Sequence, residues 1–232
     1  MRGFTIAKFV LGLAFLAGSN LFATACISGT LASYIALNPT GCTIGLFTFQ
    51  NFSFAVTSSS GGPTLLTTSG INLTPYTDGT YGGVNFTGAF SLTGAKAVTY
   101  EIDYTIDPPP PILHDLELDM FSETPVAPGT ADITSTICAG ALFVGVTCSG
   151  TLTSATVYHH GSFGSLLQDV ATFGATNIID LRTSIALNGH ITGSSDIKGF
   201  GMVSNPEPGT LLLAAAGLGA LIFARRRRTL RG

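Results

Sequence analysis

Residues 97–107 read AVTYEIDYTID, and this stretch indicates the fold class of the chain. Every second side chain is β-branched or aromatic, and the side chains between them are mostly polar. The apolar set is Val98, Tyr100, Ile102, Tyr104 and Ile106. A period of two places successive side chains on opposite faces of a β-strand. The stretch therefore predicts a half-buried strand with one face in a core and the other in water.

Similar segments follow along most of the chain. LHDLELDMF at 113–121 alternates in the same way, and further strands are predicted within GLFTFQNFSFAV, GVNFTGAFSL, ALFVGVTC, TLTSATVYHH, NIIDLRTSIAL and IKGFGMV. Turn-forming segments such as SSSGGP, YTDGTYGG and TGSSD lie between them. Many short strands without long helical periodicity predict an all-β domain over residues 26–204. We expect an antiparallel β-sandwich of jelly-roll-like or Ig-like type.

Charge is distributed unevenly along the 232 residues. Seven of the 10 Lys and Arg residues lie in the first 25 positions or the last eight, whereas all 13 acidic residues lie between Asp78 and Glu207. The interior therefore holds three basic residues against 13 acidic ones, a net charge of about −10. Because phosphate contacts require basic patches, nucleic acid is not an expected partner.

The first 25 residues have the three parts of a secretory signal. Arg2 and Lys8 form a positive start, residues 9–17 are apolar, and Ala23-Thr24-Ala25 matches the A-x-A cleavage pattern. We therefore predict a signal helix within residues 1–25 and cleavage after Ala25 by the secretion machinery. An uncleaved anchor or a buried core helix is the alternative.

The four cysteines are Cys26, Cys42, Cys138 and Cys148. An even number in an exported chain indicates two disulfides, and their order favours Cys26–Cys42 and Cys138–Cys148, although three pairings exist. Cys26 directly follows the predicted cleavage point, so lipidation of Cys26 stays open as an alternative. Neither a C-x-x-C motif nor zinc-type histidine spacing accompanies the cysteines, so we expect no metal site there.

The densest run of charge is a set of seven acidic residues, namely Glu101, Asp103, Asp107, Asp115, Glu117, Asp119 and Glu123. We interpret them as the solvated face of a sheet, with a Ca²⁺ site as the weaker alternative. His159 and His160 are adjacent on a predicted strand and point to opposite faces, which disfavours a shared metal. The sequence contains no P-loop, dinucleotide fingerprint or G-x-S-x-G elbow. We therefore predict no catalytic residue and no cofactor.

The C-terminal residues 205–232 read NPEPGTLLLAAAGLGALIFARRRRTLRG. Pro206-Glu207-Pro208 precedes an unbroken run of 14 apolar or small residues, which leads into Arg225, Arg226, Arg227 and Arg228. As a helix this run is about 21 Å long, and snorkelling side chains extend its reach toward a bilayer core of about 30 Å. We predict a transmembrane helix at 210–224, with the arginines as a topological stop on the cytoplasmic side.

These three parts in this order resemble the PEP-CTERM sorting signal, a tail that is also labelled the ice-binding protein C-terminal domain. Two positions depart from that family, Asn205, where Val is more common, and Gly209, where Ser or Ala is common. The interior also resembles the Gly/Ser/Thr-rich β-domains that precede this tail, including a last strand at Ser194–Val203. The resemblance implies a Gram-negative, exopolysaccharide-producing source. It further implies a transient inner-membrane anchor, cutting near Pro206-Glu207-Pro208 by an exosortase-type transpeptidase, and release to the cell surface or matrix.

The predicted organisation is thus a signal peptide at 1–25, a β-sandwich at 26–204 and a sorting signal at 205–232. The leading functional hypothesis is a non-enzymatic, exported cell-surface or extracellular-matrix protein. A carbohydrate-binding module for exopolysaccharide is the alternative, since sandwiches often carry such sites. A polysaccharide hydrolase that uses the acidic stretch is less well supported, because nothing singles out an acid and a nucleophile.

Overall fold

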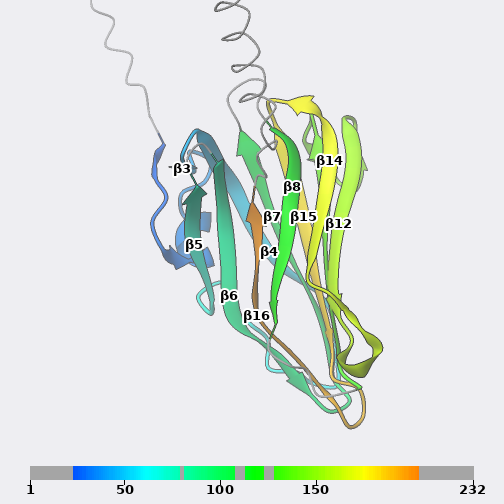
Figure 1. The fold of residues 1–232 in the computed structure, drawn as a ribbon. Helices are drawn as coiled ribbons and strands as arrows, with labels where there is room; N and C mark the ends of the chain where they lie inside the picture. The colour runs from blue at the N-terminus through cyan, green and yellow to red at the C-terminus, as the bar shows by residue number, and fades with distance from the viewer. Residues whose placement is uncertain (1–22, 79–80, 108–112, 123–127, 204–232) are drawn as a thin grey trace, which may run out of the picture.

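A computed structural model describes residues 23–78, 81–107, 113–122 and 128–203. These residues form two sheets stacked face to face, as Figure 1 shows. Within the described residues every strand pair is antiparallel except β1 with β3. The predicted all-β antiparallel sandwich is therefore confirmed. The predicted signal helix at 1–25 lies almost wholly outside the described residues, and the transmembrane helix at 210–224 lies entirely outside them.

Sheet A has eight strands in the order β1-β3-β4-β7-β15-β9-β12-β13. They span Thr24–Ala25, Cys42–Ile44, Phe47–Ser60, Ala97–Asp107, Ile179–Asn188, Thr130–Ala139, Thr151–His159 and Ser165–Leu166. Sheet B has six strands in the order β14-β8-β16-β6-β5-β2. They span Gln168–Thr176, Leu113–Ser122, Ser194–Val203, Tyr81–Thr93, Ile71–Asp78 and Gly29–Thr30. The remaining elements are α1 (Leu31–Ile35), η1 (Gly161–Phe163) and a separate hairpin of β10 (Phe143–Val144) and β11 (Thr147–Cys148).

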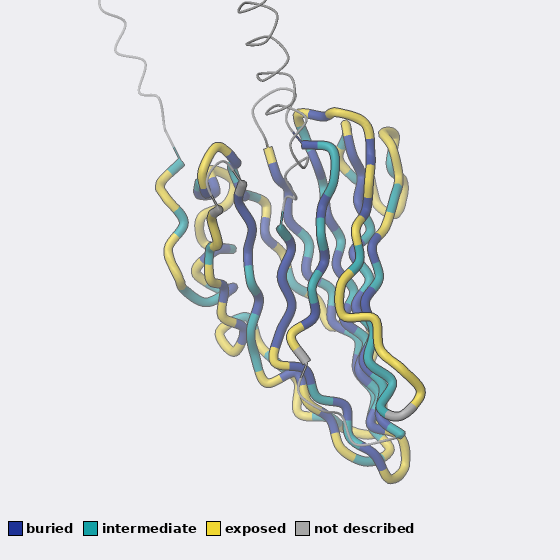
Figure 2. Tube along the Cα trace, viewed as in Figure 1, coloured by how far each residue is buried: buried dark blue, intermediate teal, exposed yellow. Residues whose placement is uncertain are grey.

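The alternating stretch at 97–107 is β7, which pairs with β4 on one side and β15 on the other. All five predicted apolar side chains are at most 2% exposed. The intervening residues Thr99, Glu101 and Asp103 are only half-buried and lie on the outer face. Figure 2 shows the same alternation of buried and more exposed positions along the other long strands. The inward face predicted for this stretch is confirmed. The outward face is not wholly in water, because Thr105 is buried there and donates to Asp180.

Aromatic rings from both sheets meet in the core between them. Phe86 of β6 stacks on Phe200 of β16, with ring centres 4.8 Å apart and planes 11° apart. The Phe86 ring also contacts Tyr104 of β7 across the sandwich, at 5.8 Å between centres. Such pairs contribute beyond the area they bury. These contacts join sheet B to sheet A at the centre of the fold.

Tyr104 carries a polar group into this core without a compensating bond. The side chain is fully buried, and its hydroxyl has no hydrogen-bond partner among the described residues. Burial raises the pKa of the Tyr104 phenol, because the charged form is disfavoured away from water. An unpaired buried hydroxyl costs about 1–3 kcal/mol of stability.

Replacing Tyr104 by phenylalanine is therefore expected to raise the free energy of unfolding by about 1–2 kcal/mol. Equilibrium urea unfolding of the two proteins measures the difference. Tyr100→Phe is the matched control, since the Tyr100 hydroxyl accepts a bond from the Leu66 amide at 3.1 Å. That change is expected to lower the free energy of unfolding. A destabilised Tyr104→Phe protein would contradict the prediction.

Candidate functional site

The acidic residues that are close together in the sequence are divided between the two outer faces of the sandwich. Glu101 and Asp103 project from β7 on the outside of sheet A, whereas Glu117 and Asp119 project from β8 on the outside of sheet B. The single solvated face that the sequence suggested is thus two separate faces. Glu123 lies outside the described residues. Among the residues that the structure describes, no three His, Cys, Asp or Glu side chains are grouped to hold a metal ion.

On sheet B, strand register brings together residues that are far apart in the sequence. Gly201 of β16 pairs with Asn85 of β6 on one side and with Asp119 of β8 on the other. The next outward-facing row along the strands contains Tyr76, Gly83, Val203 and Glu117. β16 pairs with β6 on one side and with β8 on the other, each in a fixed register. Residues more than 100 positions apart in the sequence therefore become neighbours on one face.

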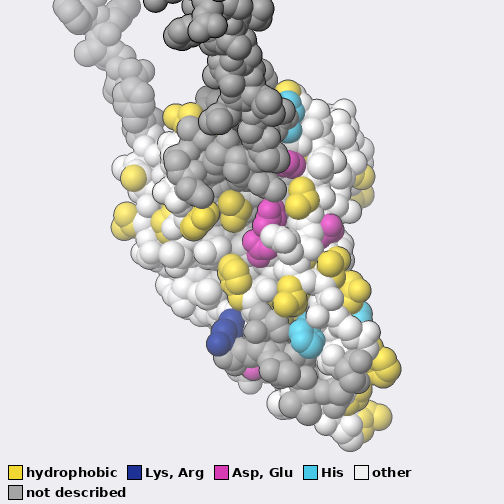
Figure 3. All heavy atoms as spheres, in the orientation of Figure 1, with side chains coloured by type: hydrophobic (Ala, Val, Ile, Leu, Met, Phe, Trp, Pro, Cys, Tyr) yellow, Lys and Arg dark blue, Asp and Glu magenta, His cyan; other side chains and the backbone are white. Residues whose placement is uncertain are grey.

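These rows border an open, shallow pocket of about 280 Å³, which we call the sheet B pocket. It is lined by Tyr76, Asn85, Glu117, Asp119, Phe121 and Val203. Gly201 lies beneath it, since an added Cβ there would be 2.4 Å from Asn85 Oδ1 and 3.3 Å from Phe121 Cζ. A glycine within a strand often marks a close approach of this kind. In Figure 3, acidic side chains gather near hydrophobic ones on the face that carries β6, β16 and β8 in Figure 1.

The aromatic rings of the sheet B pocket are accessible from solvent. Tyr76 is 42% exposed and Phe121 is 38% exposed, in contrast to the fully buried rings between the sheets. Exposed apolar side chains that flank polar groups in a concave site are typical of binding sites, whereas single exposed apolar side chains are common on any protein surface. The pocket therefore combines ring faces with carboxylate and amide groups.

Electrostatic repulsion is built into the sheet B pocket. Burial raises the pKa of the Asp119 carboxyl above its usual value, and the charge of Glu117 raises it further. A hydrogen bond from the Gln168 side chain to Asp119 lowers the pKa of the Asp119 carboxyl. The Gln168 amide also donates to Glu117 Oε1. None of the residues that line the pocket is basic. The two carboxylates are therefore close together without a lining cation to offset them.

Asp119→Asn is accordingly expected to raise the melting temperature at neutral pH and to have less effect under acidic conditions. A raised pKa in the folded state means that the folded protein binds the Asp119 proton more tightly than the unfolded chain. Wild-type stability from this group thus falls as pH rises from the unfolded pKa to the folded one. Thermal unfolding of both proteins between about pH 3.5 and 7.5 measures the effect. A constant difference in melting temperature over this range would contradict it.

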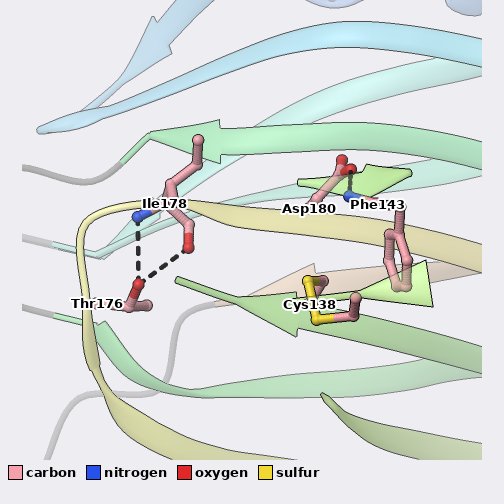
Figure 4. The surroundings of a disulfide bond; sticks show 6 residues. Cys138, Phe143, Thr176, Ile178 and Asp180 are labelled. Carbon is pink, nitrogen blue, oxygen red and sulfur yellow. Dashed lines mark hydrogen bonds between the residues drawn. A yellow bond between two sulfur atoms is a disulfide. The ribbon is translucent and has the colours of Figure 1, made fainter. Parts of the chain in front are cut away.

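A second pocket, of about 260 Å³, lies on the outer face of sheet A beside the β10–β11 hairpin. The Arg182 guanidinium is 4.9 Å from the centre of the Phe143 ring, and its Nη2 donates to the Gly145 carbonyl at 3.0 Å. The Asp180 carboxylate accepts from the Phe143 amide at 2.8 Å, as Figure 4 shows, and from the Thr105 hydroxyl at 3.1 Å. These contacts attach the hairpin to sheet A. Asp180 and Arg182, the main charged groups on this side of the pocket, therefore have a structural role.

Asp103 completes the charge arrangement of this second pocket. Burial raises the pKa of its carboxyl, the Glu101 charge adds to this, and Arg182 opposes it. The distance from Asp103 Oδ1 to Arg182 Nε is 3.6 Å, and Glu101 Oε1 is 3.8 Å from the same nitrogen. The Arg182 guanidinium thus lies near two carboxylates and also contacts the β10–β11 hairpin.

Both disulfides that the order of the cysteines favours are present. Cys26 joins Cys42 and Cys138 joins Cys148, with Cα–Cα distances of 4.9 Å and 5.6 Å. The Cys26 sulfur is therefore engaged, which argues against the lipidation alternative. Ala25, the residue before it, pairs with Thr43 in β1–β3. Cleavage after Ala25 would remove β1 and leave the disulfide intact.

The adjacent histidines do not form a shared site. His159 ends β12, and its Nδ1 accepts a bond from the Gly161 amide at 3.2 Å. His160 lies beyond the strand, where its Nε2 is 2.8 Å from Asp132 Oδ1. Each ring thus has its own local partner. Both contacts tie the end of β12 to its surroundings.

A family model of the PEP-CTERM protein-sorting motif matches residues 206–228. The chain carries a PEP-CTERM sorting motif. The match begins at Pro206 and ends at Arg228, so it includes the Pro-Glu-Pro segment and all four arginines of the cluster. The PEP-CTERM residues themselves lie outside the described part of the structure. In the described ranges, no helix has the length and apolar character needed to cross a membrane.

The PEP-CTERM motif begins shortly after the folded domain ends. β16 ends at Val203, which lines the sheet B pocket, and Pro206 is the third residue beyond it. The last strand predicted by resemblance, Ser194–Val203, has the same bounds as β16. It lies inside sheet B, between β8 and β6, and not at an edge.

Among solved structures, that of TmCBM61 in complex with beta-1,4-galactotriose is similar at 11% sequence identity and a TM-score of 0.34. The match covers 65% of this chain and 86% of that chain. No curated protein matches the sequence.

Proposed function

We propose that this protein is a non-enzymatic cell-surface or extracellular-matrix protein that an exosortase-type transpeptidase processes at its PEP-CTERM motif. The motif at 206–228 carries the proposal, because it implies export and processing by an exosortase. Two disulfides support it, since such bonds persist in oxidising compartments outside the cytosol. The β-domain would be the part delivered, and a transient anchor in the inner membrane would hold the chain until it is cut.

The physical basis lies in the order of the tail. Pro206 and Pro208 would restrict the backbone to extended conformations and would present the Glu207 carboxylate between them. Four arginines after the apolar run would resist transfer across the membrane and keep the C-terminus in the cytoplasm. The Pro-Glu-Pro segment would then stand on the far side of the bilayer, close to the end of β16.

Replacement of Pro206, Glu207 and Pro208 by alanine in the native host is expected to abolish processing and to leave the protein in the membrane fraction. Fractionation and intact-mass spectrometry measure the location and the cut. Asn205→Val is the matched control, because it restores the more common residue beside an intact motif and should preserve processing. Unchanged surface delivery and mass in the alanine variant would overturn the proposal.

Binding of exopolysaccharide is a second candidate function, and the sheet B pocket favours it. Ring faces of Tyr76 and Phe121 can pack against the apolar face of a sugar, while the Asn85 amide and the carboxylates can bind its hydroxyls. Phe121→Ala is expected to abolish binding of the host's polysaccharide to the full-length chain. Retained binding by that variant would place any glycan site elsewhere.

A further inference from the structure

We propose that the sheet B pocket binds an amine-bearing glycan, a polymer of hexosamine units with protonated primary amines. This inference rests on the second candidate function and narrows its ligand class. It depends on three features of the pocket, namely its size, its aromatic walls and the sign of its charge.

The size and walls favour one sugar ring. The volume of about 280 Å³ is at the small end for ligand pockets, which suits a single unit of a polymer that continues along the sheet. Register places Tyr76 on β5 and Phe121 on β8, with β6 and β16 between them. Asn85 Oδ1 and the Phe121 ring already fill the space directly over Gly201, so a sugar ring would lie above these two groups. Phe121 on one side and Tyr76 on the other would then be partners for its apolar C–H face.

The negative charge of the pocket favours amine-bearing glycans over neutral and acidic ones. Glu117 and Asp119 project from the same face of one strand, and the charge of Glu117 disfavours ionisation of Asp119. The Gln168 amide already donates to both carboxylates. An ammonium group beside them would form charge-assisted hydrogen bonds with the carboxylate oxygen positions that Gln168 does not use, and it would relieve that repulsion. A neutral sugar would leave the repulsion in place, and a uronic acid would increase it. The acidic interior of the chain acts in the same direction at longer range.

A simple cation would satisfy the charge but leave the rest of the pocket unused. Two carboxylates from one strand provide fewer oxygen ligands than Ca²⁺ usually takes, and the described residues contain no group of three metal ligands. Neither would a metal ion use the exposed rings of Tyr76 and Phe121. A ligand that carries both a positive charge and an apolar face makes use of every lining group.

The test compares two probes that differ only at the amine. Full-length protein in mild detergent is titrated calorimetrically with a glucosamine oligomer and with the N-acetylated oligomer of the same length and linkage. The amine form is expected to bind about tenfold more tightly or better, and its affinity should fall with added salt. Glu117→Gln combined with Asp119→Asn should remove the preference, because both amides keep the shape of the site without the charge.

Two controls keep the outcomes separate. Asp115→Asn removes a carboxylate from β8 outside the pocket lining and should leave the preference intact, while Phe121→Ala should abolish binding of both oligomers. Equal binding of the two oligomers would overturn the amine inference and retain the glycan site. Binding of neither oligomer would overturn the inference, and only failure with the host's polysaccharide as well would remove the second candidate function. Circular dichroism of each variant shows whether it folds.

Discussion

Phe200→Ala is expected to lower the free energy of unfolding by about 4 kcal/mol. The Phe200 ring is fully buried between the sheets, stacks on Phe86 at 4.8 Å between centres and contacts Phe90 at 6.3 Å. Truncation removes the buried area and leaves a cavity that the strands cannot easily close, because both neighbours of β16 are hydrogen-bonded to it. Equilibrium urea denaturation measures the loss as a lower midpoint.

Phe121→Ala is the matched control for this experiment. Phe121 lies on the neighbouring strand β8 and pairs with Gly199 of β16, yet its side chain is on the outer face and is 38% exposed. Its loss is expected to cost less than about 1 kcal/mol. If Phe200→Ala and Phe121→Ala were equally mild, the aromatic contacts between the sheets would not be the main source of stability.

Removal of the Cys138–Cys148 disulfide by serine at both positions is expected to cost about 2–4 kcal/mol. The bridge joins a fully buried cysteine at the end of β9 to β11, with a sequence separation of 10. Without it, the β10–β11 hairpin loses its covalent link to β9, and its contacts with Arg182 and Asp180 remain. The unfolded chain also gains conformational freedom, which lowers stability further.

Two measurements separate the global effect of this disulfide from its local effect. Chemical denaturation gives the loss of stability, and hydrogen exchange reports the Phe143 amide, which donates to Asp180. Serine at Cys26 and Cys42 is the control, since that bridge joins β3 to the residue after β1, and β4 and β7 lie between β3 and β15, the strand that carries Arg182 and Asp180. Faster exchange at Phe143 in both double variants, or in neither, would contradict the local role of the Cys138–Cys148 bridge.

Much of the fold could be predicted because strand formation depends on a local pattern. The alternation at 97–107 and 113–121 appears as β7 and β8 with the expected faces buried. The pattern does not predict β5 or β14. β5 contains Pro75, which suggests a break, and β14 buries only Ala171, Phe173 and Thr176 as an edge strand. Their strand state depends on pairing with β6 and β8.

The candidate site could not be predicted in this way. Its lining residues come from β5, β6, β16 and β8. The sequence placed Tyr76 in a turn segment and Asn85 and Phe121 in strands, and it assigned none of the three to a functional site. Only the carboxylates Glu117 and Asp119 stood out in the sequence, within a run that the structure divides between two faces. An exposed aromatic residue beside an alternating acidic strand was the available signal.

The sequence by itself determined the all-β class, the favoured pairing of the cysteines and the sorting tail, because these depend on local alternation, on cysteine order and on a motif that is contiguous in the chain. The tertiary structure alone decided which acidic residues are neighbours and where aromatic rings meet them. Pairing of β8 with β16, and of β16 with β6, sets that arrangement. Register follows from burying the apolar faces of all strands at once, and no single stretch of sequence contains that condition.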